Sequence, residues 1–259
     1  MLRKPFPQPF LTGSLFLGLG ILTAGALACD SNPTGPPDPE ALSVLFIGNS
    51  LTYSNDLPDL LKQLLKVAQP NPVHVEAVAL PDYGLPDHWV SGSSRKRLAA
   101  GGWDLVVLQQ GPSATEGRPY LLEYTERFDS EIRAQGGQTA LFMVWPARTR
   151  SFDFPGVLDS YRTAADQVDG VFFPAGEAWQ IAWETDPDLA LYGPDGFHPT
   201  LLGSYLAAVV MMESITGYDP RDLPPTIRRK NNSVQLDSEV ADLIYGAAVE
   251  ANRRYPGGP

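Results

Sequence analysis

Cysteine is almost absent from this sequence, since Cys29 is the only one among 259 residues. A single cysteine cannot form an internal disulfide, so the folded chain must be stabilised by the packing of its core. Histidine is scarce as well, with three residues and no His-x-x-x-His pattern. These shortages argue against a zinc site, and we expect no bound metal.

Basic residues are also in short supply, with 19 Lys and Arg against 30 Asp and Glu and a formal net charge of −11. Such a surface repels phosphate backbones, which argues against nucleic-acid binding. No glycine-rich phosphate loop occurs at a strand-to-helix turn, so nucleotide binding is not expected either. The chemistry considered below needs no cofactor.

The N-terminus has the pattern of a targeting segment. A basic start precedes an apolar stretch over residues 10–27, and Ala26-Leu27-Ala28 stands directly before Cys29. This pattern predicts a signal peptide over residues 1–28, of the lipoprotein type with a lipidated Cys29. Ordinary secretion is the alternative, because Ala26 stands where such signals usually have Leu. We expect an exported protein that meets the membrane only through an N-terminal lipid anchor, in the periplasm or at the cell surface.

Residues 29–41 are rich in proline and predict a linker between the lipid and the folded part. The remaining residues, 42–259, are enough for one α/β domain with a well-buried core. No internal repeat and no second domain are apparent.

Apolar runs alternate with helical patterns along this domain. The expected strands are Ser43–Gly48, Val73–Leu80, Leu105–Gln109, Thr139–Val144 and Gly170–Phe173. The expected helices are 57–65 with Asp56 as a cap, Arg118–Ala134, Pro155–Val168, Thr200–Thr216 with Pro199 in its first turn, and Ser238–Arg254. The alternation predicts a three-layer α/β/α fold around a central, mainly parallel five-stranded sheet.

A first chemical motif, Gly48-Asn49-Ser50-Leu51-Thr52, follows the apolar run 44–47. Ser50 therefore falls in the turn that leaves the carboxyl end of a predicted strand. Functional sites of parallel sheets form at that edge. On its own, the motif could equally be a polar turn.

A second motif, Asp195-Gly196-Phe197-His198-Pro199, places a carboxylate three residues before an imidazole. The carboxylate can bind one ring nitrogen while the other nitrogen faces a nucleophile. Helix capping is the alternative explanation. Of the other histidines, we expect His74 to be structural within a strand, and His88 to line a pocket or lie on the surface.

With both motifs in this order, the chain resembles the SGNH hydrolase superfamily, the GDSL-like esterases and lipases. The resemblance covers residues 43 to 216 and implies a flavodoxin-like sheet. It also implies that Ser50 is the nucleophile, His198 the base and Asp195 its acid partner. Asn49 replaces the Asp of the family's Gly-Asp-Ser-Leu block.

Two further blocks of the family match less well. The resemblance implies that the N–H groups of Ser50 and Gly84 form the oxyanion hole, although Gly84 could be an ordinary turn residue. Ser113 stands where the family has an Asn whose amide completes the hole. Gln110 is the first candidate to replace that amide, and Gln109 is the alternative.

Together these features predict a serine esterase acting on short-chain, acetyl-type esters, with a small molecule or a glycan as substrate. The alternatives are a glycan-binding lipoprotein without catalysis and an acyltransferase using the same triad. The residues that could contact substrate are Asn49, Tyr53, Trp89, Ser113 and Tyr192, with Tyr83 and Trp145 as further aromatic candidates.

Overall fold

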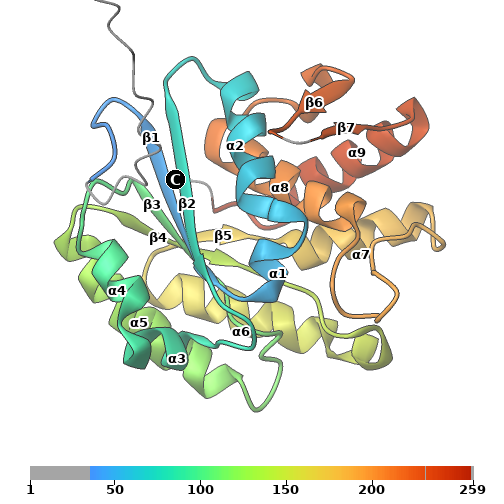
Figure 1. The fold of residues 1–259 in the computed structure, drawn as a ribbon. Helices are drawn as coiled ribbons and strands as arrows, with labels where there is room; N and C mark the ends of the chain where they lie inside the picture. Colours follow the sequence, from blue (N-terminus) through green and yellow to red (C-terminus); the bar gives the residue numbers. More distant parts are fainter. Residues whose placement is uncertain (1–35, 231, 258–259) are drawn as a thin grey trace, which may run out of the picture. The chain divides into compact units, whose positions relative to one another are not determined.

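The computed structural model describes residues 36–230 and 232–257 (Figure 1). The predicted signal peptide, Cys29 and the first part of the predicted linker lie outside these residues. Within the described part of the chain, no helix is both long and apolar enough to cross a membrane.

A five-stranded sheet forms the centre of the domain, in the order β2-β1-β3-β4-β5. All neighbouring strands are parallel. The strands are β1 Leu42–Gly48, β2 Val73–Ala79, β3 Leu105–Leu108, β4 Gln138–Phe142 and β5 Val171–Phe173. This is the flavodoxin-like order, in which the chain reverses direction across the sheet between β1 and β3. The predicted fold class is confirmed.

The central strands are apolar because both of their faces are covered. Val44, Leu45, Phe46 and Ile47 of β1 are completely buried, as is Val107 of β3. A strand that alternated between apolar and polar residues would leave polar groups against one helical layer.

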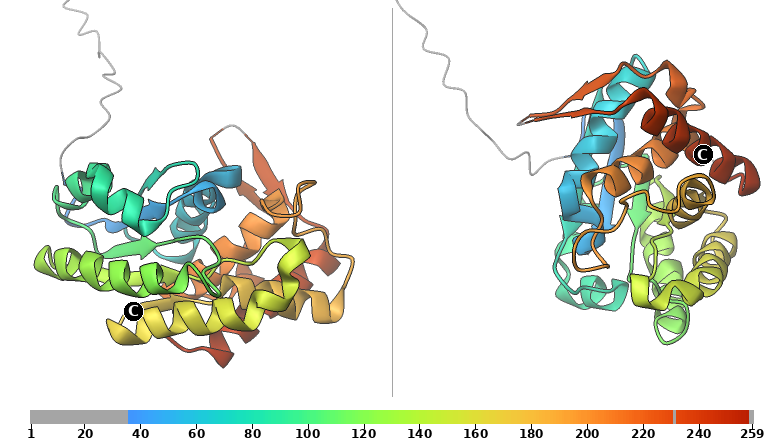
Figure 2. Two further views of the ribbon diagram at one scale, coloured as in Figure 1. Left: turned by 90° about the horizontal axis from the view of Figure 1, so that it is seen from below. Right: turned by 90° about the vertical axis from the view of Figure 1, so that its right-hand side faces the viewer.

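Two groups of helices cover the sheet. On one side, α2 (Leu57–Ala68) packs on α8 (Leu201–Thr216), and α8 contacts α7 (Ala175–Thr185) and α9 (Ser238–Arg254). The other side carries α3 (Leu85–Ser91), α4 (Ser93–Leu98), α5 (Arg118–Ala134) and α6 (Phe154–Gln167), with α5 and α6 side by side (Figure 2).

The remaining elements are short and lie in the connections between these strands and helices. They are α1 Ser50–Tyr53, η1 Ser54–Asp56, η2 Arg148–Asp153, η3 Pro220–Asp222, and the antiparallel hairpin of β6 Thr226–Arg228 and β7 Ser233–Gln235.

The predicted strands and helices are present with small shifts at their ends. The helices α3, α4 and α7 and the β6–β7 hairpin were not predicted. Two expectations about helix starts, Asp56 as a cap and Pro199 in a first turn, are wrong in detail. Asp56 precedes α2 in a left-handed backbone conformation (φ 53°), and its side chain accepts no capping hydrogen bond from the helix. Pro199 lies before the first turn of α8, whose N-cap is Thr200, accepting a hydrogen bond from the Gly203 N–H.

Candidate active site

The last position of β1, Gly48, has no room for a side chain. A Cβ atom on Gly48 would collide with the side-chain oxygens of Thr52 and Gln109. The next residue, Asn49, is the N-cap of α1, and its side-chain oxygen accepts from the Leu51 N–H. This geometry places Ser50 at the first helical position, half-buried at the carboxyl edge of the sheet.

Gln109, directly after β3, fixes this turn from the neighbouring strand. Its side-chain oxygen accepts from the Asn49 N–H and from the Thr52 hydroxyl, both at 2.8 Å. Its amide nitrogen donates to the carbonyl oxygen of Gln110. Asn49 in turn donates from Nδ2 to the carbonyl oxygen of Tyr83, 2.9 Å away, and is 8% exposed. The side chain of Asn49 is therefore part of the scaffold beneath Ser50.

The second motif forms a tight turn before α8. Asp195 accepts through Oδ2 from His198 Nδ1 at 2.6 Å, and through Oδ1 from the N–H groups of Phe197 and His198 at 3.0 Å each. Gly196 adopts φ 68°, a left-handed conformation that glycine takes without strain. A carboxylate acceptor on Nδ1 leaves the proton there and directs the basic electron pair to Nε2.

The hydrogen bond from His198 lowers the pKa of Asp195 to about 2, and the two backbone N–H groups act in the same direction. The carboxylate is therefore charged at any pH near neutrality. Both side chains are partly open to solvent, at 41% for His198 and 52% for Asp195.

Three contacts hold the loop of residues 192–198 against the segment that follows β4. The Trp145 indole N–H donates to the Phe197 carbonyl oxygen (3.0 Å), and the Arg148 N–H donates to the Gly196 carbonyl oxygen (2.8 Å). Tyr192 donates its hydroxyl to the Pro146 carbonyl oxygen.

The Ser50 turn and the His198 turn are joined by Asn55 of η1. Its Nδ2 donates to the carbonyl oxygen of Pro199 (3.0 Å) and to Ser204 Oγ (2.9 Å). Among the hydrogen bonds of residues 36–230 and 232–257, none joins Ser50 Oγ to His198. The structure thus brings the two predicted partners to one edge of the sheet without a direct bond between them.

Two of the three predicted oxyanion donors, Gly84 and Gln110, are engaged in other hydrogen bonds. The Gly84 N–H donates to Asp87 Oδ2 at 2.8 Å, which caps α3. Gln110 Nε2 donates to Ser113 Oγ and to the Gly117 carbonyl oxygen, both at 2.9 Å. Gln110 Oε1 accepts from the Leu85 N–H at 3.1 Å. The Ser50 N–H, by contrast, has no acceptor within the described chain.

The remaining predicted contacts separate into buried and exposed residues. Tyr53, beside Ser50, is 43% exposed, whereas Tyr192 is 6% exposed and its burial raises its pKa to about 12. Trp89 packs edge-on against Phe128 of α5, with the Arg95 guanidinium 4.3 Å above its ring. Trp89 therefore packs against α5, and Tyr192 is buried beside the Pro146 carbonyl.

Two histidines have structural positions. His74 lies in β2 and binds Glu76. His88 is fully buried in α3, so the expectation of a surface position is wrong. Its Nε2 donates to the Gly48 carbonyl oxygen at 2.8 Å and its Nδ1 accepts from Ser94 Oγ at 2.7 Å; burial lowers its pKa. A neutral His88 thus supports the turn below Ser50.

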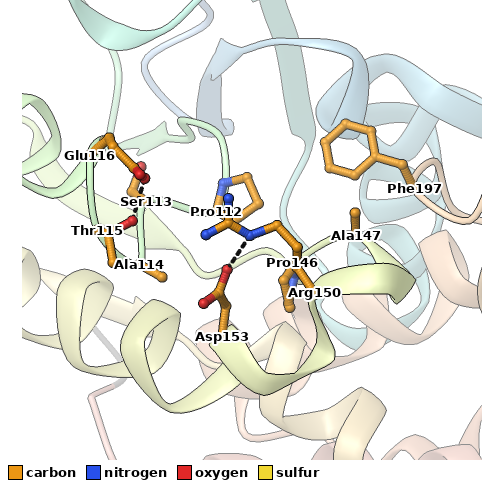
Figure 3. Close-up of a pocket in the computed structure, with 11 residues that line it drawn as sticks. Pro112, Ser113, Ala114, Thr115, Glu116, Pro146, Ala147, Arg150, Asp153 and Phe197 are labelled. Atoms are coloured by element: carbon orange, nitrogen blue, oxygen red, sulfur yellow. Dashed lines mark hydrogen bonds and ion pairs between the residues drawn. The ribbon is translucent and has the colours of Figure 1, made fainter.

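A cavity of about 290 Å³ lies beside His198, between the loops that follow β3 and β4 (Figure 3). Figure 3 shows the Ser113–Glu116 turn on one side, Phe197 on the other and Arg150 between them. Arg150 donates from Nε to Asp153 Oδ2 at 2.5 Å. The Phe197 ring lies 5.3 Å from the His198 ring, so the cavity opens next to the predicted base.

The sequence patterns do not predict Asn55, or the cavity residues Glu116, Arg150, Asp153 and Phe197. The cavity residues could have been found, because they follow the carboxyl ends of β3 and β4 or lie within the second motif. Within the described ranges, no group of three or more His, Cys, Asp and Glu side chains is arranged to hold a metal ion.

No protein-family model and no curated protein matches this sequence. Solved structures do match. A protein from Slackia heliotrinireducens assigned to the SGNH hydrolases superposes with a TM-score of 0.58 and 24% identity, covering 67% of this chain and 98% of its own. The fold is that of the SGNH hydrolases.

Two further solved structures share this fold. A DUF4886 family protein from Bacteroides uniformis has a TM-score of 0.60 and 18% identity, over 83% of this chain and 96% of that one. An acetylxylan esterase from Geobacillus stearothermophilus, solved as a catalytic mutant, has a TM-score of 0.50 and 17% identity, over 69% and 94%.

Proposed function

We propose that this protein is a serine esterase that hydrolyses short-chain acyl esters, acetyl esters above all. The observation that carries the proposal is the 2.6 Å hydrogen bond between Asp195 and His198, in a turn tied to the Ser50 turn through Asn55. A serine hydroxyl needs such an oriented base to become a nucleophile.

In the proposed reaction, Ser50 Oγ attacks the ester carbonyl carbon while His198 Nε2 takes its proton. Asp195 stabilises the imidazolium that forms. His198 then protonates the leaving alcohol as the tetrahedral intermediate collapses to an acyl-serine. Water, deprotonated by His198, attacks the acyl-serine and releases the carboxylic acid, and the proton returns to Ser50.

The negative oxygen of the intermediate needs hydrogen-bond donors. The Ser50 N–H is the donor without a competing acceptor in the described structure. Gly84 and Gln110 join it in our proposal by giving up their present partners, Asp87 and Ser113. Removal of one such donor typically lowers kcat by about 10²–10³-fold.

The cavity beside His198 suits the alcohol part of the ester. Its wall combines the carboxylates of Glu116 and Asp153 with the Arg150 guanidinium, and the Phe197 ring provides an apolar face. Carboxylates and guanidinium groups bind vicinal hydroxyls, and an aromatic ring packs on the C–H face of a sugar. We therefore propose an acylated sugar as the substrate, in line with the acetylxylan esterase that shares the fold.

The test is the hydrolysis of p-nitrophenyl acetate and of an acetylated xylo-oligosaccharide by the purified protein. Ser50→Ala should abolish both activities. Ser54→Ala is the matched control, since it removes a hydroxyl from the next element without touching the proposed triad. Equal rates in wild type and Ser50→Ala would refute the esterase proposal.

A second candidate is a glycan-binding protein that does not cleave its ligand. The engagement of Gly84 and Gln110 with Asp87 and Ser113 favours it, because a site that never frees these donors stabilises an oxyanion poorly. Saturable binding of the acetylated oligosaccharide without acetate release would support this candidate. Transfer of the acetyl group to an added sugar, faster than to water, would instead indicate an acyltransferase.

We also propose that the protein is exported and anchored through a lipidated Cys29. Intact mass spectrometry of the protein isolated from membranes should show a diacylated N-terminal cysteine. Cys29→Ala should move the protein to the soluble exported fraction. An unmodified N-terminus in the wild type would favour ordinary secretion.

A further inference from the structure

Asn55 has an unusual position between the two halves of the proposed site. It lies five residues after Ser50, yet its side chain binds the carbonyl oxygen of Pro199, the residue that follows His198. The same amide nitrogen contacts Ser204 Oγ in α8, whose hydroxyl also reaches the Ser54 carbonyl oxygen. One side chain therefore links the nucleophile turn to the base turn.

The backbone at Asn55 is held in a conformation that few residues adopt freely. Asn55 and Asp56 both have positive φ, at 55° and 53°. Asparagine tolerates this left-handed region better than other non-glycine residues, but two in succession still need outside support.

Arg229 supplies that support from the C-terminal hairpin. Its Nη2 donates to the carbonyl oxygens of Asn55 (2.8 Å) and Asp56 (3.3 Å). Its Nε donates to Asp59 of α2 at 3.0 Å, and the side chain is only 7% exposed. A largely buried guanidinium that binds both carbonyl oxygens of the turn and a carboxylate of α2 holds the strained turn in place.

We infer that Asn55, held by Arg229, is a positioning residue that sets the separation of Ser50 from His198. The inference rests on the proposed esterase function. Because no direct hydrogen bond joins Ser50 to His198 in the described chain, the scaffold must fix their separation. A misplacement of about 1 Å between reacting groups can cost about 10²-fold in rate.

The test uses two substitutions that remove the amide donor in different ways. Asn55→Gly keeps the left-handed backbone accessible, and Asn55→Asp keeps the shape but places an acceptor against the Pro199 carbonyl. We expect both to lower kcat for p-nitrophenyl acetate by about 10- to 100-fold while KM changes little. The rate of covalent labelling of Ser50 by a fluorophosphonate should fall in parallel. Arg229→Lys loses the planar guanidinium that binds the turn and Asp59 together. Its kcat and its labelling rate should fall by a smaller factor than those of the Asn55 variants.

The matched control is Asn252→Ala in α9. Asn252 also donates its amide to a backbone carbonyl, that of Val210 at 2.9 Å, but it lies on the α8–α9 interface. The Asn252→Ala variant should lose stability as the Asn55 variants do, but it should keep the wild-type kcat. This separates a loss of positioning from a general loss of folding, which urea unfolding of each variant measures independently.

The outcomes distinguish the inference from the function it rests on. If both Asn55 variants keep kcat and labelling rate while Ser50→Ala is inactive, the inference is wrong and the esterase stands. An equal loss of kcat in Asn252→Ala also overturns it. If wild-type Ser50 neither hydrolyses esters nor reacts with the fluorophosphonate, the proposed function fails, and the inference fails with it.

Discussion

Trp145 donates its indole N–H to the carbonyl oxygen of Phe197, 3.0 Å away, and so connects the end of β4 to the residue next to His198. The Trp145 ring is fully buried and stacks on Trp179, with centroids 3.6 Å apart. The aromatic core thereby extends to the turn that carries the proposed base.

Trp145→Phe should therefore lower both stability and activity. It leaves the Phe197 carbonyl without its donor and removes buried ring area, which together cost about 1–3 kcal/mol in the free energy of unfolding. The loosened His198 turn should reduce kcat by about tenfold.

The control for this prediction is Trp183→Phe. Trp183 also donates its indole N–H to a carbonyl, that of Leu189 at 2.9 Å, and also contacts Trp179. Urea unfolding and p-nitrophenyl acetate kinetics on both variants give the comparison. Equal losses of kcat would show that Trp145 has no special connection to the site.

Asp195→Asn should retain the folded turn but lose most of the activity. An amide oxygen can still accept from the Phe197 and His198 N–H groups, which keeps the backbone in place. It cannot stabilise an imidazolium or fix the Nδ1 proton, so kcat should fall by about 10²–10⁴-fold. Asp188→Asn, an exposed aspartate before the same loop, should leave kcat unchanged. An active Asp195→Asn variant would contradict the assigned role of the carboxylate.

The sheet and much of the site could be predicted because their signals are local. The buried run 44–47 identifies β1, and the Asp195-x-x-His198 spacing brings its two side chains into contact within one turn. Likewise, the periodic apolar residues of α5 and the glycines after it mark that helix from Arg118 to Ala134.

What was missed depends on tertiary contacts. Helix α7 is buried on most of its surface, from Ala175 to Ala182, so it shows no clean amphipathic stripe. The Asn55–Pro199 hydrogen bond joins residues 144 positions apart. The present partners of Gly84 and Gln110 likewise depend on how separate loops meet, which spacing in a sequence does not encode.

The Asp195 carboxylate should add nothing to the pH dependence of the proposed activity above about pH 4. The pKa of Asp195 is lowered to about 2, from an ordinary 3.8. Its contribution to the turn is therefore complete above about pH 4 and is lost only as the pH falls toward 2. A decline in kcat/KM above about pH 4 must then come from a group other than Asp195.

A rate profile from pH 4 to 9, with folding followed by circular dichroism, measures this dependence. We expect the slope of log(kcat/KM) against pH not to exceed one above about pH 4 while the protein stays folded. A slope of two above pH 4 would mean that a second group, such as Asp195 itself, titrates in that range. The assignment of a permanently charged Asp195 would then be wrong.

Substitution of Gln110 tests whether its amide reaches the oxyanion. Gln110→Ala removes the acceptor of the Leu85 N–H and the donor to Ser113, so the free energy of unfolding should fall by about 1–3 kcal/mol. If the amide exchanges its partners during the reaction, as proposed, kcat should also fall by about 10²–10³-fold. Ser113→Ala is the matched variant, because it removes a competing acceptor of Gln110 Nε2 and should leave kcat equal or higher. A Gln110→Ala enzyme with normal kcat but lower stability would show that Gln110 only braces the loop, and that the oxyanion is met without it.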